Sequence, residues 1–184
     1  MKKFLIIALF ISTFIFTSKK SNAMSFYSGL GLGDTRSKIK DTNFDERRSL
    51  TFSVGSSFSV PLFPIRLEAE YLKFNSKKDS QQAHIYGSGI NTYVNIPLLP
   101  ILVPYIGLGL SYAKEKIDNN ETKTSIKSNG RIIPQYIIGL DLDLPTVIFA
   151  GSMEYRYINS DFKFDDEKLA SKYHVFLLKA RLKF

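Results

Sequence analysis

Apolar and polar residues alternate along most of this chain with a period of two. Such alternation is typical of β-strands that present one face to an apolar environment and the other to a polar one. No segment after the first 23 residues shows a sustained helical period. The pattern predicts eight strands at Ser25–Thr35, Ser49–Val60, Ile65–Phe74, His84–Ile96, Pro104–Ala113, Ile132–Leu144, Val147–Ile158 and Tyr173–Phe184.

The connectors between these strands alternate between two kinds. Four are long and charged: Arg36–Arg48, Asn75–Ala83, Lys114–Arg131 and Ser160–Lys172. Three are short, mostly apolar and marked by proline: Pro61–Ile65, Pro97–Val103 and Leu144–Thr146. This rhythm is typical of transmembrane barrels, which have short periplasmic turns and longer external loops. We therefore predict an all-β fold, an eight-stranded antiparallel up-and-down transmembrane β-barrel.

The first 23 residues have the composition of an export signal. Lys2 and Lys3 precede the apolar run Phe4–Phe16, and Ser21–Ala23 supplies small residues for cleavage after Ala23. Lys19 and Lys20 are unusual so close to that site and leave an uncleaved anchor as the alternative. We predict a signal peptide over 1–23 and one barrel domain over 24–184.

Composition narrows the possible partners and the source of stability. Removing the signal leaves 21 basic and 17 acidic residues, an excess too small and dispersed for nucleic-acid binding. The chain has no cysteine, so no disulfide framework can stabilise it outside the cell. A closed barrel can be stabilised by its backbone hydrogen bonds instead, because every strand edge is paired with a neighbouring strand.

Side-chain size separates a membrane barrel from a soluble one. The second predicted strand sets Leu50, Phe52 and Val54 on one face against Thr51 and Ser53 on the other. A soluble barrel would expose the polar face, with bare glycines such as Gly55, Gly107 and Gly109 on its surface. In a membrane barrel those glycines line a narrow lumen and leave room for large side chains from other strands. We favour the membrane barrel.

The same parity directs five basic and five acidic side chains into the lumen. Buried charges persist when they are paired and hydrogen-bonded, so we expect an internal salt-bridge network. A barrel of eight strands has little space for a passage, which favours packing over the alternative of a gated pore or proton path. The predicted lumen residues are Arg66, Glu68, Glu70, Asp141, Asp143, Glu154, Arg156, Lys179, Arg181 and Lys183.

Aromatic residues are expected at both membrane interfaces, as in the aromatic girdles of membrane barrels. The outer girdle would contain Tyr71, Phe74, Tyr86, Tyr112 and Tyr157, and the inner girdle Phe26, Phe58 and Phe184.

Three segments resemble the opacity-protein-like surface antigens, small eight-stranded barrels similar to the barrel domain of outer membrane protein A. They are Ile65–Tyr71, Val103–Ala113 and Glu154–Tyr157. The resemblance implies location in the cell outer membrane of a Gram-negative bacterium and a surface antigen or adhesin. It also implies that the last strand, ending in Phe184, is the signal read by the barrel-assembly machinery.

The chain has few candidate catalytic residues. Lipid A-modifying barrels use a base such as histidine at the outer rim, and the chain has two histidines, His84 and His174. Both are predicted to point outward, and neither precedes a serine at the His-X-Ser spacing. No metal-ligand spacing or phosphate-binding loop appears. We predict no catalytic residue, no cofactor and no metal site.

The external loops are the expected working surface, because loops on a rigid scaffold usually carry function. Six basic residues are candidates for contact with anionic lipid groups or with a host-cell surface protein or glycan: Lys38, Lys40, Arg47, Arg48, Lys116 and Lys123. We expect a monomer embedded in outer membrane lipids that acts as a surface antigen and possible adhesin without enzymatic activity. The alternatives are a lipid A-modifying enzyme and a narrow channel.

Overall fold

A computed structural model describes residues 24–40, 42–59, 63–97, 101–143, 148–164 and 167–184. The predicted signal peptide, 1–23, lies outside the described residues. Within them, no helix is long and apolar enough to cross a bilayer. The described strands are β1 (Met24–Ile39), β2 (Thr42–Phe58), β3 (Ile65–Lys78), β4 (Gln81–Asn95), β5 (Leu102–Asn119), β6 (Thr124–Lys127), β7 (Arg131–Asp143), β8 (Phe149–Phe164) and β9 (Glu167–Lys183).

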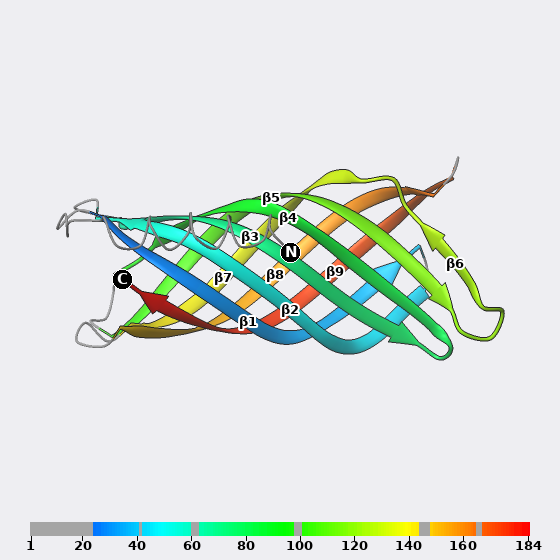
Figure 1. Cartoon of the computed structure of the whole chain (residues 1–184), viewed down its shortest axis with the longest axis horizontal. Helices are drawn as coiled ribbons and strands as arrows, with labels where there is room; N and C mark the ends of the chain where they lie inside the picture. The colour runs from blue at the N-terminus through cyan, green and yellow to red at the C-terminus, as the bar shows by residue number, and fades with distance from the viewer. Residues whose placement is uncertain (1–23, 41, 60–62, 98–100, 144–147, 165–166) are drawn as a thin grey trace, which may run out of the picture.

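Eight of these strands close into a ring (Figure 1). Every wall strand pairs antiparallel with its neighbours in the sequence, and β1 closes the barrel by pairing with β9 from Tyr27↔Lys183 to Ile39↔Ser171. The short β6 pairs only with the outer end of β5 and is not a wall strand. The predicted fold class is therefore confirmed, because the hydrogen-bonded ring leaves no edge along the membrane-spanning part of the wall.

The connectors predicted as long external loops are mostly strand. The β3–β4 ladder continues to Lys78↔Gln81, so that connection is a turn at Asp79 and Ser80. Lys40 and Asp79 adopt positive φ angles of 54° and 50°, the left-handed conformation that tight turns use. The prediction was wrong here because charged residues alternate with small or apolar ones, so the strands extend beyond the bilayer as hairpins.

The apolar face of the wall points outward. Leu108, Leu110 and Leu178 are more than half exposed, whereas Ile133, Ile137 and Val175 on the opposite face are almost completely buried. In a bilayer the exposed set contacts the acyl chains. The lumen is filled by the buried set, as expected for a barrel of eight strands.

The lumen contains an ionic region toward the periplasmic end and an apolar layer toward the outer end. The apolar layer contains Leu72, Phe74, Ile85, Ala113, Ile133, Ile158, Phe162, Tyr173, Val175 and Leu177. Phe74 was predicted for the outer aromatic girdle and that prediction was wrong. It is fully buried, because it shares the inward parity of Glu68 and Glu70 on β3.

Candidate functional site

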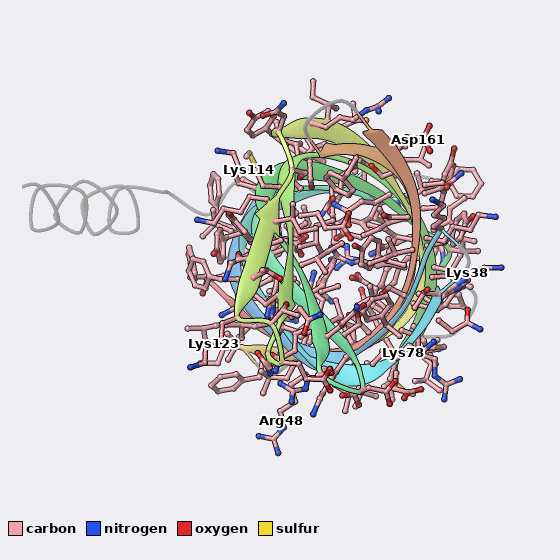
Figure 2. The ribbon with its side chains drawn as sticks, turned by 90° about the vertical axis from the view of Figure 1, so that its right-hand side faces the viewer. Lys38, Arg48, Lys78, Lys114, Lys123 and Asp161 are labelled. Carbon is pink, nitrogen blue, oxygen red and sulfur yellow. The ribbon has the colours of Figure 1, made fainter. Side chains whose placement is uncertain are left out.

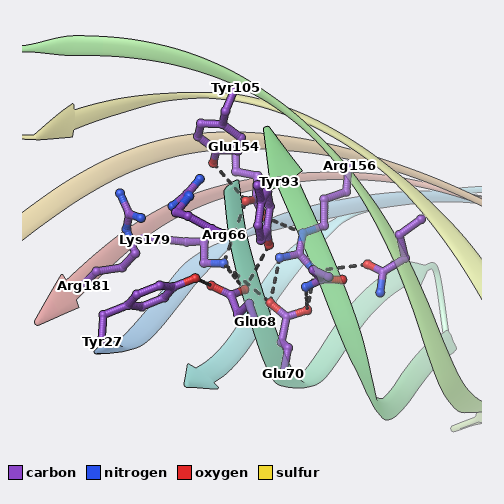
Figure 3. Close-up of polar contacts among 12 residues, drawn as sticks. Tyr27, Arg66, Glu68, Glu70, Tyr93, Tyr105, Glu154, Arg156, Lys179 and Arg181 are labelled. Carbon is purple, nitrogen blue, oxygen red and sulfur yellow. Dashed lines mark hydrogen bonds and ion pairs between the residues drawn. The ribbon is translucent and has the colours of Figure 1, made fainter. Parts of the chain in front are cut away.

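The centre of the ionic region is an arginine bound by carboxylates from two strands (Figure 3). Arg156 of β8 donates from Nη1 to Oε1 of Glu70 at 2.5 Å and from Nη2 to Oε2 at 2.7 Å. Its Nε donates to Glu154 at 2.5 Å, and Nη1 also donates to the Gln135 side-chain oxygen at 3.1 Å. The Arg156 guanidinium therefore donates four hydrogen bonds, and the two-point contact with Glu70 fixes β8 against β3.

A lysine on β9 connects the remaining glutamates. The Nζ atom of Lys179 lies 2.8 Å from Oε1 of Glu68, 3.7 Å from Glu70 and 3.8 Å from Glu154. The hydroxyl groups of Tyr93 and Tyr27 also donate to Glu68, at 2.9 and 3.2 Å. Charged groups in this region therefore have several partners each, which offsets the cost of removing them from water.

A second cluster lies nearer the periplasmic end of the lumen. Arg66 and Arg181 both contact Oδ2 of Asp141, at 3.3 and 2.8 Å. The Arg66 guanidinium lies beside the rings of Tyr93 and Tyr105, 4.7 Å from each ring centre, and the two rings contact each other edge to face. Cation–π contact with two rings stabilises a guanidinium that water does not reach.

The structure brings together eight of the ten predicted lumen residues, all of them buried. They are Arg66, Glu68, Glu70, Asp141, Glu154, Arg156, Lys179 and Arg181. Lys183 is half-buried at the periplasmic end, and the side chain of Asp143 lies outside the described residues. The eight buried groups comprise four cations and four anions, so the described part of the network is neutral.

Sequence reasoning missed the uncharged partners of this network. Tyr27, Tyr93 and Tyr105 are buried in the lumen, and Tyr105 donates to Glu154 at 2.9 Å. Asn91 donates to Glu70 at 3.2 Å, and Gln135 also belongs to the network. Inward parity could have identified all five, because each lies an even number of residues along its strand from a residue already predicted to face the lumen, such as Gly29, Gly89, Gly107 or Asp141. A lumen filled this way is suited to fixing strand register.

A separate buried carboxyl, also missed, lies in the outer part of the barrel. Glu115 of β5 is fully buried and accepts hydrogen bonds from the hydroxyl groups of Ser171, at 3.1 Å, and Tyr173. Its neighbours Lys114 and Lys116 point away from the lumen, which places this part of β5 beyond the bilayer. Burial raises the pKa of Glu115 to about 7, an effect that the hydrogen bonds from Tyr173 and Ser171 only partly offset.

The two histidines lie on the outer face of the wall, as their parity predicts. His84 forms a 2.7 Å hydrogen bond with the Asn75 side chain, and its Nε2 lies 3.7 Å from Asp118. Partial burial lowers the pKa of His84. His174 forms a 2.7 Å hydrogen bond with the Tyr155 hydroxyl. Among the described residues, neither histidine bonds a serine hydroxyl, the arrangement that would activate a nucleophile.

Basic side chains surround the outer opening (Figure 2). Of the six predicted contact residues, Lys38, Lys40, Arg47, Arg48 and Lys123 are exposed, and Lys116 is half-buried. Lys116 forms a 2.7 Å ion pair with Asp118. The candidates lie on the β1–β2 and β5–β6 hairpins, so the strands hold them above the membrane. No group of three or more metal-binding side chains occurs among the described residues.

Comparison with known proteins identifies the family. The model of the outer membrane protein beta-barrel domain matches residues 6–184. Among solved structures, Neisserial surface protein A has a TM-score of 0.67 at 16% identity over 86% of this chain and 97% of its own. Ail of Yersinia pestis, in complex with the heparin analogue sucrose octasulfate, has a TM-score of 0.57 at 17% identity over 88% and 99%.

OprG from Pseudomonas aeruginosa has a TM-score of 0.51 at 12% identity, over 88% of this chain and 96% of its own. The search of curated proteins finds no match. The family match agrees with the closed ring and the outward apolar face, and it confirms the predicted small outer-membrane barrel. The chain belongs to the outer membrane protein beta-barrel family and resides in the cell outer membrane.

Proposed function

We propose that this protein is a non-enzymatic surface antigen and adhesin whose basic hairpins bind anionic groups on a host surface. The supporting observation is the position of the charges. The lumen network is neutral and buried, whereas Lys38, Arg48 and Lys123 are exposed on hairpins that extend past the membrane. Charges at such a rim attract an anionic partner over about a Debye length.

The hairpins differ in charge. The segments Arg36–Arg48 and Lys114–Arg131 each contain five basic and three acidic residues. The segment Ser160–Lys172 contains three basic and four acidic residues. An anionic ligand is therefore expected to contact the first and third outer hairpins, Arg36–Arg48 and Lys114–Arg131, and to avoid the fourth, Ser160–Lys172. Sulfated glycan is a suitable ligand class, and a heparin analogue occupies the solved complex of the structurally similar Ail.

The test is retention of the detergent-solubilised protein on immobilised heparin, together with attachment of bacteria that display it to cultured cells. Replacing Lys38, Arg48 and Lys123 by glutamine should lower the salt concentration of elution and reduce attachment. As a matched control, replacing Asp45 by asparagine on the same hairpin should raise the elution salt. Unchanged elution and attachment in the triple variant would contradict the proposal.

The absence of enzymatic activity is part of the same proposal. Lipid A chemistry would need a base beside a nucleophile, and the bonds of His84 and His174 go to Asn75 and Tyr155 instead. Replacing both histidines by alanine should therefore leave the lipid A of the cell unchanged. A changed lipid A mass spectrum would favour the enzyme.

We also propose that the protein is a monomer and that Phe184 is its assembly signal. Phe184 directly follows β9, its side chain is exposed, and its backbone exchanges hydrogen bonds with Phe26 of β1. Replacing Phe184 by serine should reduce the folded protein in outer membranes, whereas replacement by tyrosine should preserve it. Equal levels in both variants would remove the assembly role.

A further inference from the structure

The outer part of the barrel wall is open between β7 and β8. Their ladder runs from Asp143↔Ala150 to Gln135↔Ile158, although β8 continues to Phe164. In the chain that the structure describes, no backbone pairing joins β8 beyond Ile158 to β7 or β6. The opposite edge of β8 stays paired with β9 as far as Phe164↔Glu167. Residues 159–164 therefore form a strand with one free edge.

A side-chain contact shows which backbone groups face the opening. Nη1 of Arg131 donates to the backbone oxygen of Asp161, so the peptide groups of Asp161 point toward β7. In an antiparallel strand the N–H and C=O of one residue point the same way, and alternate residues share that direction. Asn159 and Lys163 therefore also direct their backbone groups into the opening, while those of Ser160 point toward β9.

Pro134 explains why the ladder stops. By the same alternation, Tyr136↔Tyr157 is a hydrogen-bonded pair, and the next such pair would join Pro134 to Asn159. Proline has no N–H to donate, so that pair cannot form and the strands separate. The sequence thus places the opening at a defined height, directly above the tyrosines of the outer girdle.

The opening is hollow and contains polar groups. A hollow of about 240 Å³ lies between the two strands, lined by Arg131, Ile132, Pro134, Asn159, Ser160 and Asp161. The hydroxyl group of Ser160 is buried there without a hydrogen-bond partner. Asp161 lies at the rim of the outer opening, where a soluble molecule can reach it (Figure 2). The free edge is therefore accessible from outside the cell.

We propose that the free edge of β8, residues 159–164, binds an extended peptide by strand addition. The edge presents a row of backbone donors and acceptors spaced as in a sheet, and another extended backbone is the partner that matches them. One of the acceptors, the oxygen of Asp161, is bound by the Arg131 side chain, which the peptide would displace. The peptide's outward side chain opposite Asp161 would be basic. Its inward side chains, beside Ser160 and Phe162, would be β-branched and apolar. This peptide edge is separate from the basic hairpins that carry the proposed adhesion.

The test is amide hydrogen exchange of the full chain in lipid nanodiscs, followed by NMR. The probe is the peptide acetyl-Thr-Val-Lys-Val-Lys-Val-Thr-amide. In the free protein the amides of Asn159, Asp161 and Lys163 should exchange rapidly, and those of Ser160 and Phe162 slowly. The peptide should slow exchange of the first three amides by about tenfold or more. The same peptide N-methylated at alternate residues should give no protection.

Two substitutions at Asp161 distinguish the contribution of its backbone N–H to peptide binding from that of its side chain. Asp161→Pro removes one N–H that faces the opening and leaves the bonds to β9, so it should abolish peptide protection. Asp161→Ala keeps that N–H and should retain most of it. The proposal is overturned if the three amides are already protected in the free protein, or if the peptide protects nothing. It is also overturned if protection rises with protein concentration alone, which would identify a second copy as the occupant.

Discussion

Arg156 and Glu70 lie on opposite walls of the barrel and form a two-point ion pair across the lumen, at 2.5 and 2.7 Å. Both side chains are buried, so neither charge has access to water. Arg156 also binds Glu154, and Glu70 also lies near Lys179. The pair therefore holds the centre of a network in which positive and negative charges balance.

Removing one member of this pair should destabilise the barrel. Arg156→Met leaves a buried excess of negative charge and Glu70→Met a buried excess of positive charge, each expected to cost about 3–5 kcal/mol. The double variant restores neutrality and should lose less than either single variant. Urea unfolding in lipid vesicles measures all three. Additive losses in the double variant would contradict the coupling.

The lumen glycines are predicted to be constrained by their neighbours. A Cβ atom at Gly139 would overlap the ring of Tyr105, whose hydroxyl binds Glu154, and the backbone oxygen of Met153, whereas a Cβ atom at Gly151 would meet nothing within 4 Å. Gly139→Ala should therefore destabilise the barrel by about 1–3 kcal/mol in the same unfolding experiment. Gly151→Ala is the matched control on the neighbouring strand and should have little effect. Equal stability of the two variants would show that the Tyr105 ring and the Met153 backbone both adjust at no cost.

Glu115 should make stability depend on pH. Its pKa is about 7 in the folded barrel against 4.5 for the free side chain, so the folded state binds the proton more tightly. The stabilisation is fully present below about pH 4.5 and is lost as the pH rises through 7. The loss by pH 8.5 is on the order of 3 kcal/mol.

Glu115→Gln should remove that dependence. The variant should be more stable than the parent at pH 8.5 and similar to it at pH 4, as measured by urea unfolding at both values. Glu121→Gln, an exposed acidic residue on the same hairpin, serves as the control and should change neither value. If parent and Glu115→Gln show the same pH profile, the carboxyl is more solvated than its burial indicates.

The lumen should not conduct ions. The ionic region is filled by groups such as Arg156, and the apolar layer above it contains Phe74 and Phe162, all fully buried. We expect silent planar bilayers for the parent and also for Arg156→Ser, because the apolar layer remains closed in that variant. Steady unit currents from the parent protein would favour the narrow channel that the sequence left as an alternative.

Much of the barrel architecture can be predicted from the alternation of side chains along each strand. Because side chains alternate strictly along a strand, the sequence places Glu70 and Arg156 in the lumen once the outward face of β3 and β8 is known. It cannot say which lumen residues meet, since that depends on the register between strands. The Glu70–Arg156 contact joins residues that are 86 positions apart and is visible only in the structure.

Two features of the lumen could not be predicted from residue composition. Charged residues in Lys114–Arg131 suggested a loop, although β5 runs to Asn119 and directs Glu115 inward. Likewise, Tyr93 and Tyr105 were not predicted as partners of the lumen charges, although they lie in the lumen beside Arg66. In both cases the parity along the strand gives the right direction, and the composition of the segment does not.

The central claim is that the apolar face of the barrel wall contacts lipid while the charged residues face the lumen. It is tested most directly with the unmodified sequence in lipid nanodiscs. With isoleucine, leucine and valine methyl groups labelled, NMR can detect contact between each methyl group and the lipid acyl chains. We expect such contacts for Leu108, Leu110, Ile138 and Leu178, which are exposed on the wall, and none for Ile133, Ile137, Val175 and Leu177, which are buried. Acyl-chain contacts at the second set, with none at the first, would show that the apolar residues form an interior core and that the barrel does not span the membrane as described.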